Sequence, residues 1–179
     1  RCDNSEIGDK GTIGDKEYTV VDEATLRTMV TSDEDVSCVC TSYVTDMNEL
    51  FRDKSTFDQD ISSWDTSNVT NMRSMFFQAI TFNQDIGNWD TSGVVYLDNI
   101  FNTATAFNQD IGGWKTSSVK GMSGLFARGI GDFPSFNQDI GGWDTSKVDN
   151  MESMFMGNRE FNQDIGDWDT SNVTDMSSM

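Results

Sequence analysis

The chain has 179 residues, of which 30 are acidic and 12 basic, so its formal net charge is −18. A surface this acidic repels phosphate backbones and anionic lipid, which argues against nucleic-acid partners. Its apolar runs are too short to span a bilayer, so we expect no membrane insertion. Twelve phenylalanines, five tryptophans and ten methionines supply apolar surface that disordered chains lack.

The first forty residues differ from the rest of the chain. We interpret residues 1–16, rich in Gly, Asp and Lys, as a loosely ordered leader. Because the chain begins with Arg1, we expect its natural start to lie elsewhere. Residues 18–21 read as a strand, and Asp22 is a suitable N-cap for a short helix over residues 23–30. Residues 17–40 are therefore predicted to form an N-terminal strand–helix cap.

All three cysteines, Cys2, Cys38 and Cys40, lie in this N-terminal part. An odd number of cysteines in an extracellular chain indicates one disulfide and one remaining thiol, or an intermolecular bond. A bond from Cys2 to either Cys38 or Cys40 would tie the leader to the cap, and the sequence leaves both pairings open.

A repeat of about 25 residues fills residues 41–179. Its tryptophans, at 64, 89, 114, 143 and 168, are separated by 25, 25, 29 and 25 residues. A half-unit, residues 41–56, precedes five units that begin at Phe57, Phe82, Phe107, Phe136 and Phe161, the last of them truncated. The longer interval holds a four-residue expansion between Phe126 and Phe136, which we interpret as a surface loop or, alternatively, a binding protrusion.

One unit is too short to enclose a core, so each must bury its apolar side chains against the next. The Phe-x-x-x-Ile string alternates as a short strand does, and the Asp-Thr-Ser that follows is turn chemistry. The later Val-x-x-Met-x-x-Met-Phe string fits a brief extended stretch and one or two helical turns. The sequence thus predicts an α/β repeat solenoid with short strands and short helical turns.

The string Val-Thr-Asn-Met-x-x-Met-Phe, seen at residues 69–76, precedes Phe-Asn-Gln-Asp-Ile-x-x-Trp-Asp-Thr-Ser at residues 82–92. Together they resemble the repeats of BspA-like leucine-rich-repeat surface proteins, and more closely the "surface protein repeat" branch. The resemblance implies a right-handed, leucine-rich-repeat-like coil that is displayed outside the cell and often associated with adhesion. It offers no catalytic residues to carry over.

One aspartate of the repeat recurs in all five units, at Asp60, Asp85, Asp110, Asp139 and Asp164. If strands pair in register, neighbouring carboxylates lie about 4.8 Å apart and repel by roughly 1 kcal/mol in water. Hydrogen bonds from backbone N–H groups at the turn would offset this repulsion. The alternative is bound calcium, which prefers carboxylate and carbonyl oxygens.

Other columns favour architecture. Lys115 interrupts a second acidic column, which indicates turn capping; its other members are Asp65, Asp90, Asp144 and Asp169. We interpret the recurring Asn and Gln as structural amide ladders bonded side chain to side chain. The Trp column is interpreted as core, with a sugar-stacking platform as the alternative. Asn68 and Asn172 begin glycosylation sequons at equivalent positions.

Function is constrained by what is absent as well as by what repeats. Without histidine, and without a unique constellation, we expect no enzyme. We predict an extracellular structural or adhesive module, a rigid segment of a larger cell-surface or filament-forming protein. A surface receptor that binds carbohydrate or protein is the alternative. The expected partner is protein, either through self-association by end-to-end stacking or through further repeats, with surface glycans as another partner.

Overall fold

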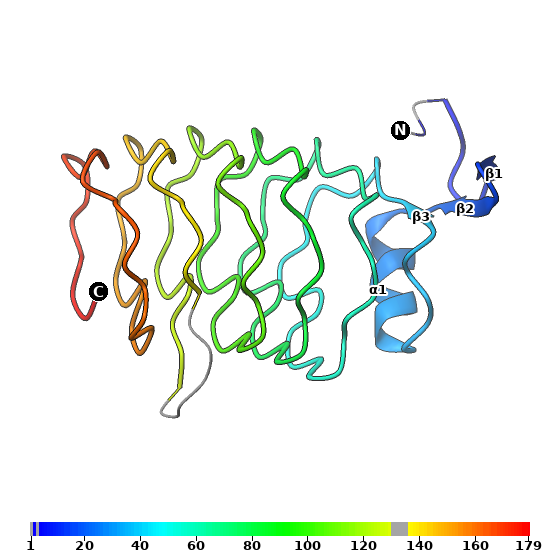
Figure 1. Cartoon of the computed structure of the whole chain (residues 1–179). Helices are drawn as coiled ribbons and strands as arrows, with labels where there is room; N and C mark the ends of the chain where they lie inside the picture. The colour runs from blue at the N-terminus through cyan, green and yellow to red at the C-terminus, as the bar shows by residue number, and fades with distance from the viewer. Residues whose placement is uncertain (1, 3, 130–135) are drawn as a thin grey trace.

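The computed structural model describes residues 2, 4–129 and 136–179. The strands and the helix of this described part all precede residue 41: β1 (Lys10–Ile13), β2 (Lys16–Val20), α1 (Glu23–Thr31) and β3 (Val39–Cys40). Strand β2 pairs antiparallel with β1 and parallel with β3, which gives one sheet of order β1-β2-β3. Figure 1 shows this sheet and α1 at one end of a long stack of turns.

Strand β2 and helix α1 form where the sequence predicts a strand and a helix. The side chain of Asp22 accepts a hydrogen bond from the Thr25 N–H, and Leu26 and Val30 are buried. Strand β1 lies inside the expected leader and is not predicted, because all four of its residues are exposed and give no alternation. No helix of the described residues is long and apolar enough to cross a membrane.

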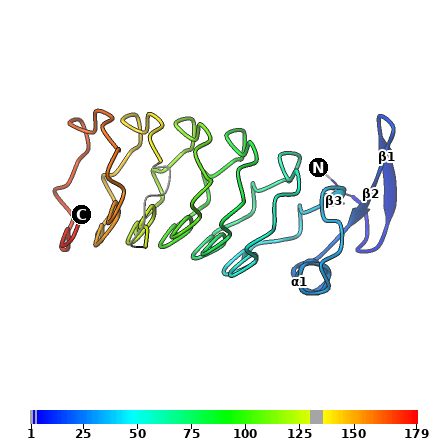
Figure 2. The same ribbon diagram turned by 60° about the horizontal axis from the view of Figure 1, so that its bottom comes forward.

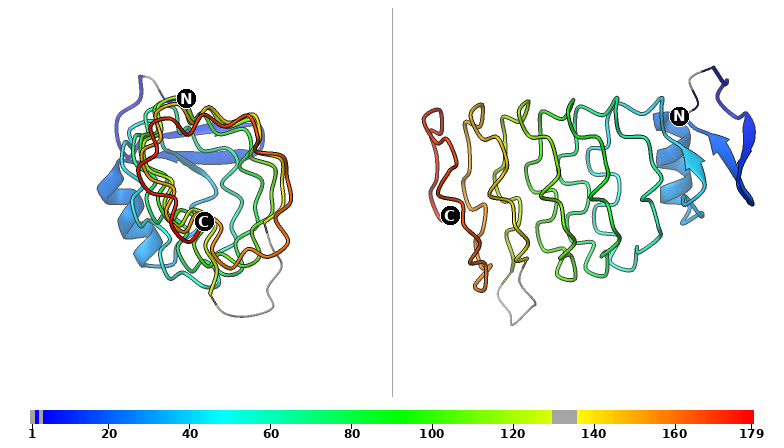
Figure 3. Two further views of the ribbon diagram at one scale, coloured as in Figure 1. Left: turned by 90° about the vertical axis from the view of Figure 1, so that its left-hand side faces the viewer. Right: turned by 45° about the horizontal axis from the view of Figure 1, so that its top comes forward.

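The prediction of an α/β repeat solenoid, a right-handed leucine-rich-repeat-like coil with short strands and short helical turns, is wrong. Among the described residues of the repeats there is no strand and no helix. Successive units meet instead at single parallel bridges, at Asp46–Asn71, Asn71–Tyr96, Tyr96–Gly121, Gly121–Asn150 and Asn150–Asp175. What the repeats build is a stack of turns, which overlay one another along its axis (Figure 3).

The segment expected to be helical makes consecutive tight turns. In the unit that contains Met72, the N–H groups of residues 72, 74, 76 and 78 donate to carbonyls of the next repeat. Those of residues 75, 77 and 79 donate to the third residue back in their own repeat. This alternation requires left-handed backbone at Ser74 (φ 54°) and Gln78 (φ 57°), which an α-helix excludes. Figure 2 shows these turns recurring along one side of the stack.

The segment expected to be a strand lies where the repeats are farther apart. The Trp64 and Trp89 rings are nearly parallel with centroids 6.4 Å apart, more than the spacing of about 4.8 Å that paired strands need. Side chains therefore bridge the gap. The Asn108 N–H donates to Asn83 Oδ1 over 3.0 Å, and Gln109 Nε2 donates to the Asn83 carbonyl over 2.8 Å. These amide ladders thus run mainly from side chain to backbone.

One continuous core fills the stack. The Trp column is 3–8% exposed, and each indole N–H donates to a carbonyl of the preceding part of the chain, as from Trp114 to Ile86 over 3.0 Å. The prediction that these tryptophans are core is confirmed. Phenylalanines form two stacked columns beside them, and the ring of Phe76, near the end of one unit, lies 3.9 Å from that of Phe82, which begins the next. The four-residue expansion before Phe136 lies largely outside the described residues.

Two adjacent glycines test how closely the repeats approach. A Cβ on Gly112 would lie 2.5 Å from the carbonyl oxygen of Asp139 in the next repeat, whereas one on Gly113 would meet only the Gly87 carbonyl, at 3.8 Å. We expect Gly112→Ala to lower the free energy of unfolding by about 1–3 kcal/mol. Gly113→Ala, the matched control, should change it by less than about 0.5 kcal/mol. Urea denaturation measures both, and equal stabilities would contradict the packing described.

Candidate functional site

The column of aspartates from Asp60 to Asp164, here called the Asp60 column, caps turns. Each carboxylate accepts a hydrogen bond from the N–H two residues on, over 2.9–3.0 Å. In the first unit the Ser62 hydroxyl adds a bond of 2.6 Å to Asp60. Each carboxylate is thereby hydrogen-bonded within its own repeat. Turn capping of this kind is the alternative to calcium binding that the sequence leaves open.

The described residues contain no group of three or more acidic or cysteine side chains placed to hold a metal ion. The carboxylates of the Asp60 column come from successive repeats, whose equivalent Trp rings lie 6.4–6.5 Å apart. That separation weakens both their mutual repulsion and their ability to share one cation. The geometry favours turn capping, and calcium binding stays a prediction.

The second acidic column also caps turns. Asp65, Asp90, Asp144 and Asp169 each accept from the N–H and the hydroxyl of the serine two residues on, with the hydroxyl bond 2.6 Å long at Asp144. Two hydrogen bonds lower the pKa of Asp144, the larger effect coming from the Ser146 hydroxyl and the smaller from the Ser146 N–H. The same two bonds from Ser171 lower the pKa of Asp169. Such bonds stabilise the charged form of the carboxylate.

These lowered pKa values predict acid sensitivity. A carboxylate whose pKa is lower in the folded state stabilises the fold above its unfolded pKa of about 3.9, and loses that contribution as pH falls through the folded value. We expect the double variant Ser146→Ala, Ser171→Ala to melt below the native chain at pH 7. The difference should shrink as pH falls below about 4.

A matched control separates this effect from the general loss of a hydroxyl. Ser118 Oγ donates to the Ser92 carbonyl over 2.9 Å, an acceptor that does not titrate. The effect of Ser118→Ala on the melting temperature should therefore be the same at pH 7 and below about pH 4. A double-variant difference that is equally independent of pH would contradict the assignment.

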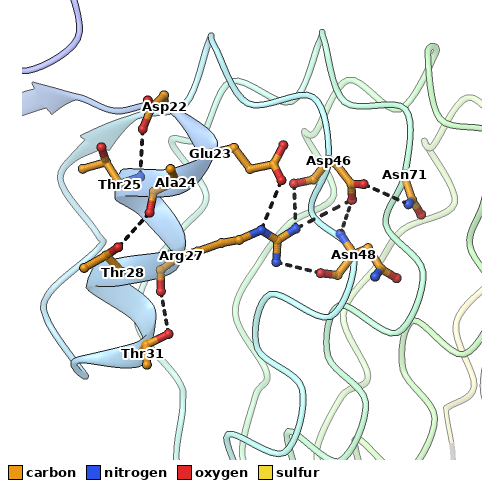
Figure 4. A network of polar contacts seen from close by, with 10 residues as sticks. All are labelled: Asp22, Glu23, Ala24, Thr25, Arg27, Thr28, Thr31, Asp46, Asn48 and Asn71. Carbon is orange, nitrogen blue, oxygen red and sulfur yellow. Dashed lines mark hydrogen bonds and ion pairs between the residues drawn. The ribbon is translucent and has the colours of Figure 1, made fainter.

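Helix α1 closes the first end of the stack through Arg27 (Figure 4). The guanidinium donates to the carbonyls of Asn48 and Asp46, over 2.9 and 3.2 Å, and also bonds Glu23. In later repeats the equivalent carbonyls, such as those of Asn71 and Arg73, accept backbone N–H groups from the preceding repeat. At this end of the stack Arg27 therefore supplies the hydrogen-bond donors that a preceding repeat supplies elsewhere.

The cysteines join the leader to the sheet. Cys2 is disulfide-bonded to Cys40, and Cys38 is a free thiol. Of the two partners that the sequence leaves open for Cys2, the structure thus bonds Cys40. The buried Cys40 follows Val39 in strand β3, so the bond fixes residue 2 beside the start of the first repeat.

Closing a loop with a sequence separation of 38 residues should stabilise the fold appreciably. We expect Cys2→Ser to lower the free energy of unfolding by about 3–4 kcal/mol, mainly because the unfolded chain gains freedom. Cys38→Ser is the control and should leave it nearly unchanged. Urea denaturation without reductant measures the difference, which reductant should abolish. A large loss of unfolding free energy in Cys38→Ser would instead indicate that Cys2 is bonded to Cys38.

Both sequon asparagines are exposed. Asn68 Nδ2 donates to the Ser42 carbonyl over 2.8 Å, and Asn172 Nδ2 donates to the Ser146 carbonyl over 2.7 Å. Each thus contacts the preceding repeat while remaining open to solvent. Glycosylation at Asn68 and Asn172 stays a prediction.

The structure brings together one polar constellation that sequence reasoning misses. Asp98, whose side chain is 9% exposed, pairs with Arg73 over 3.0 Å and accepts from the Ser123 hydroxyl over 2.9 Å. These three occupy equivalent positions in successive repeats. Gly121 leaves room for the carboxylate, because a Cβ there would lie 2.4 Å from Asp98 Oδ2. Aligning the units and looking for departures from the pattern would have found it.

Comparison with known proteins gives one family. The family model described as "Mycoplasma protein of unknown function, DUF285" matches residues 21–133 and 130–179. No curated protein and no solved structure gives a significant match.

Proposed function

Because the chain belongs to the DUF285 family, whose description assigns no function, we propose from its geometry that it is an extracellular structural or adhesive repeat module. It would serve as a rigid segment of a larger cell-surface or filament-forming protein. The observation that carries the proposal is that the recurring polar side chains bond to a neighbouring repeat or to their own turn. The buried Thr91 hydroxyl, for example, donates to the Lys115 carbonyl over 3.1 Å.

An extracellular location draws support from several features. A disulfide such as Cys2–Cys40 persists in oxidising surroundings and is rare in the cytosol. The net charge of −18 favours solubility, because molecules that carry the same charge repel one another. The resemblance of the repeat string to BspA-like surface proteins, and to the surface-protein-repeat branch in particular, adds to this support.

Self-association is part of the proposal. Within the stack each repeat buries the same side chains beneath the next one, as Met151 and Met154 are buried beneath the repeat that follows them. We propose that copies of the chain, or further repeats, associate by the same end-to-end stacking. The contact is head-to-tail, so it propagates rather than closes.

Surface labelling and solution scattering test the proposal. On intact cells that produce the protein, a membrane-impermeant biotin ester should label the exposed Lys120 and Lys147, and a cytosolic protein is the negative control. Duplicating residues 82–106 should lengthen the particle by one repeat spacing, about 5–6 Å, without lowering its melting temperature. Labelling only after lysis would refute the location, and an unchanged length would refute the rod.

A further inference from the structure

A hollow lies on the turn side of the stack, where one repeat has small residues that the other repeats lack. Gly124 stands at the position held elsewhere by Glu, Ser or Asn, and Ala127 at the position held by Arg52, Phe77, Asn102 and Met156. The hollow opens above these two buried residues and is walled by Asn99, Asn102, Ser123, Glu152, Ser153 and Met156.

The wall from the preceding repeat is held in place. A Cβ at Gly124 would lie 2.3 Å from Asn99 Oδ1, so glycine is what lets this amide occupy its place. Asn99 Oδ1 accepts from Asn102 Nδ2 over 2.8 Å, and Asn102 Oδ1 accepts from the Thr103 hydroxyl over 2.9 Å. These bonds fix the orientation of both amides. The amide donors of this wall are the Asn99 Nδ2 and the second hydrogen of the Asn102 Nδ2.

The opposite wall offers an acceptor and an apolar surface. Glu152 is anchored through its backbone, since its N–H donates to Asn150 Oδ1 and its carbonyl accepts from the Gly124 N–H. Its side chain is exposed to solvent. Met156, 47% exposed, lines the same hollow with an apolar side chain. An amide donor, a carboxylate acceptor and an apolar side chain therefore surround one small space.

We propose that this hollow binds one neutral hexose unit of a glycan. Vicinal hydroxyls both donate and accept, so one can donate to the Glu152 carboxylate while its neighbour accepts from the Asn99 amide. The Met156 side chain would pack against the C–H face of the sugar ring. An anionic ligand is disfavoured, because Glu152 and a net charge of −18 repel it. This inference goes beyond the proposed function and is independent of where the protein resides.

Titration of the full chain by ¹⁵N–¹H NMR tests the site. The probes are the methyl glycosides of glucose, galactose, mannose and N-acetylglucosamine, with methyl glucuronide and glucosamine as anionic and cationic comparisons. At least one neutral glycoside should shift the amide signals of Asn99, Gly124 and Glu152 and saturate in the millimolar range. The glucuronide should bind at least several-fold more weakly.

Two pairs of variants give the specificity. Ala127→Leu should abolish binding by filling the hollow, whereas Ala106→Leu, at a position that carries Thr81 and Glu160 in other repeats, should not. Glu152→Gln should weaken binding about tenfold, the loss of one charge-assisted hydrogen bond. Glu17→Gln, in strand β2, is its control and should bind as the native chain does.

Three results would overturn the proposal. The first is that none of the four neutral glycosides shifts these signals. The second is that Ala127→Leu, shown to be folded by circular dichroism, binds as tightly as the native chain. The third is that glucosamine alone binds and Glu152→Gln abolishes its binding, which would make this an amine site. If Ala127→Leu does not fold, the comparison of Glu152→Gln with Glu17→Gln decides.

Discussion

The stack depends on one arrangement of the backbone, in which every second N–H of the turn segment points at the next repeat. Four such bonds leave the unit of Met72, and the N–H groups between them close turns within the unit. All the donors of the segment are thereby satisfied without a helix or a strand, which a buried backbone requires. The cost is left-handed backbone at Ser74 and Gln78. It recurs at the equivalent pairs Glu49 and Asp53, Asn99 and Thr103, and Ser153 and Gly157.

This arrangement sets the distances elsewhere in the repeat. On the turn side the repeats meet at parallel bridges, while at the Trp column equivalent rings lie 6.4 Å apart. Along this side, side chains make the hydrogen bonds between repeats: amides at Asn83 and Gln109, and the indole at Trp114. Asn, Gln and Trp recur because their side chains make these bonds in every repeat, on the side where the repeats are more widely spaced.

The sequence predicts the stack better than it predicts the local conformation. The period and the core residues can be read from the recurrence of Phe, Ile, Trp and Met, because burial against a neighbour requires the same side chain at the same place. The helical turns are mispredicted because Met72, Met75 and Phe76 have helical spacing, and apolar spacing does not report the sign of φ at Ser74. The bonds of Asp98 and the hollow at Gly124 are not predicted, because each depends on a residue that departs from the repeat pattern in one unit.

Those departures concentrate on the turn side for a physical reason. There backbone hydrogen bonds already join the repeats, so most outward side chains are not needed for stacking and can change. The column of Arg52, Phe77, Asn102, Ala127 and Met156 shows how widely they do. On the Trp side the side chains themselves form the joints, and a change costs a hydrogen bond on each side of the repeat. A rod built in this way keeps one side nearly constant and leaves the other free to acquire a binding site at any repeat.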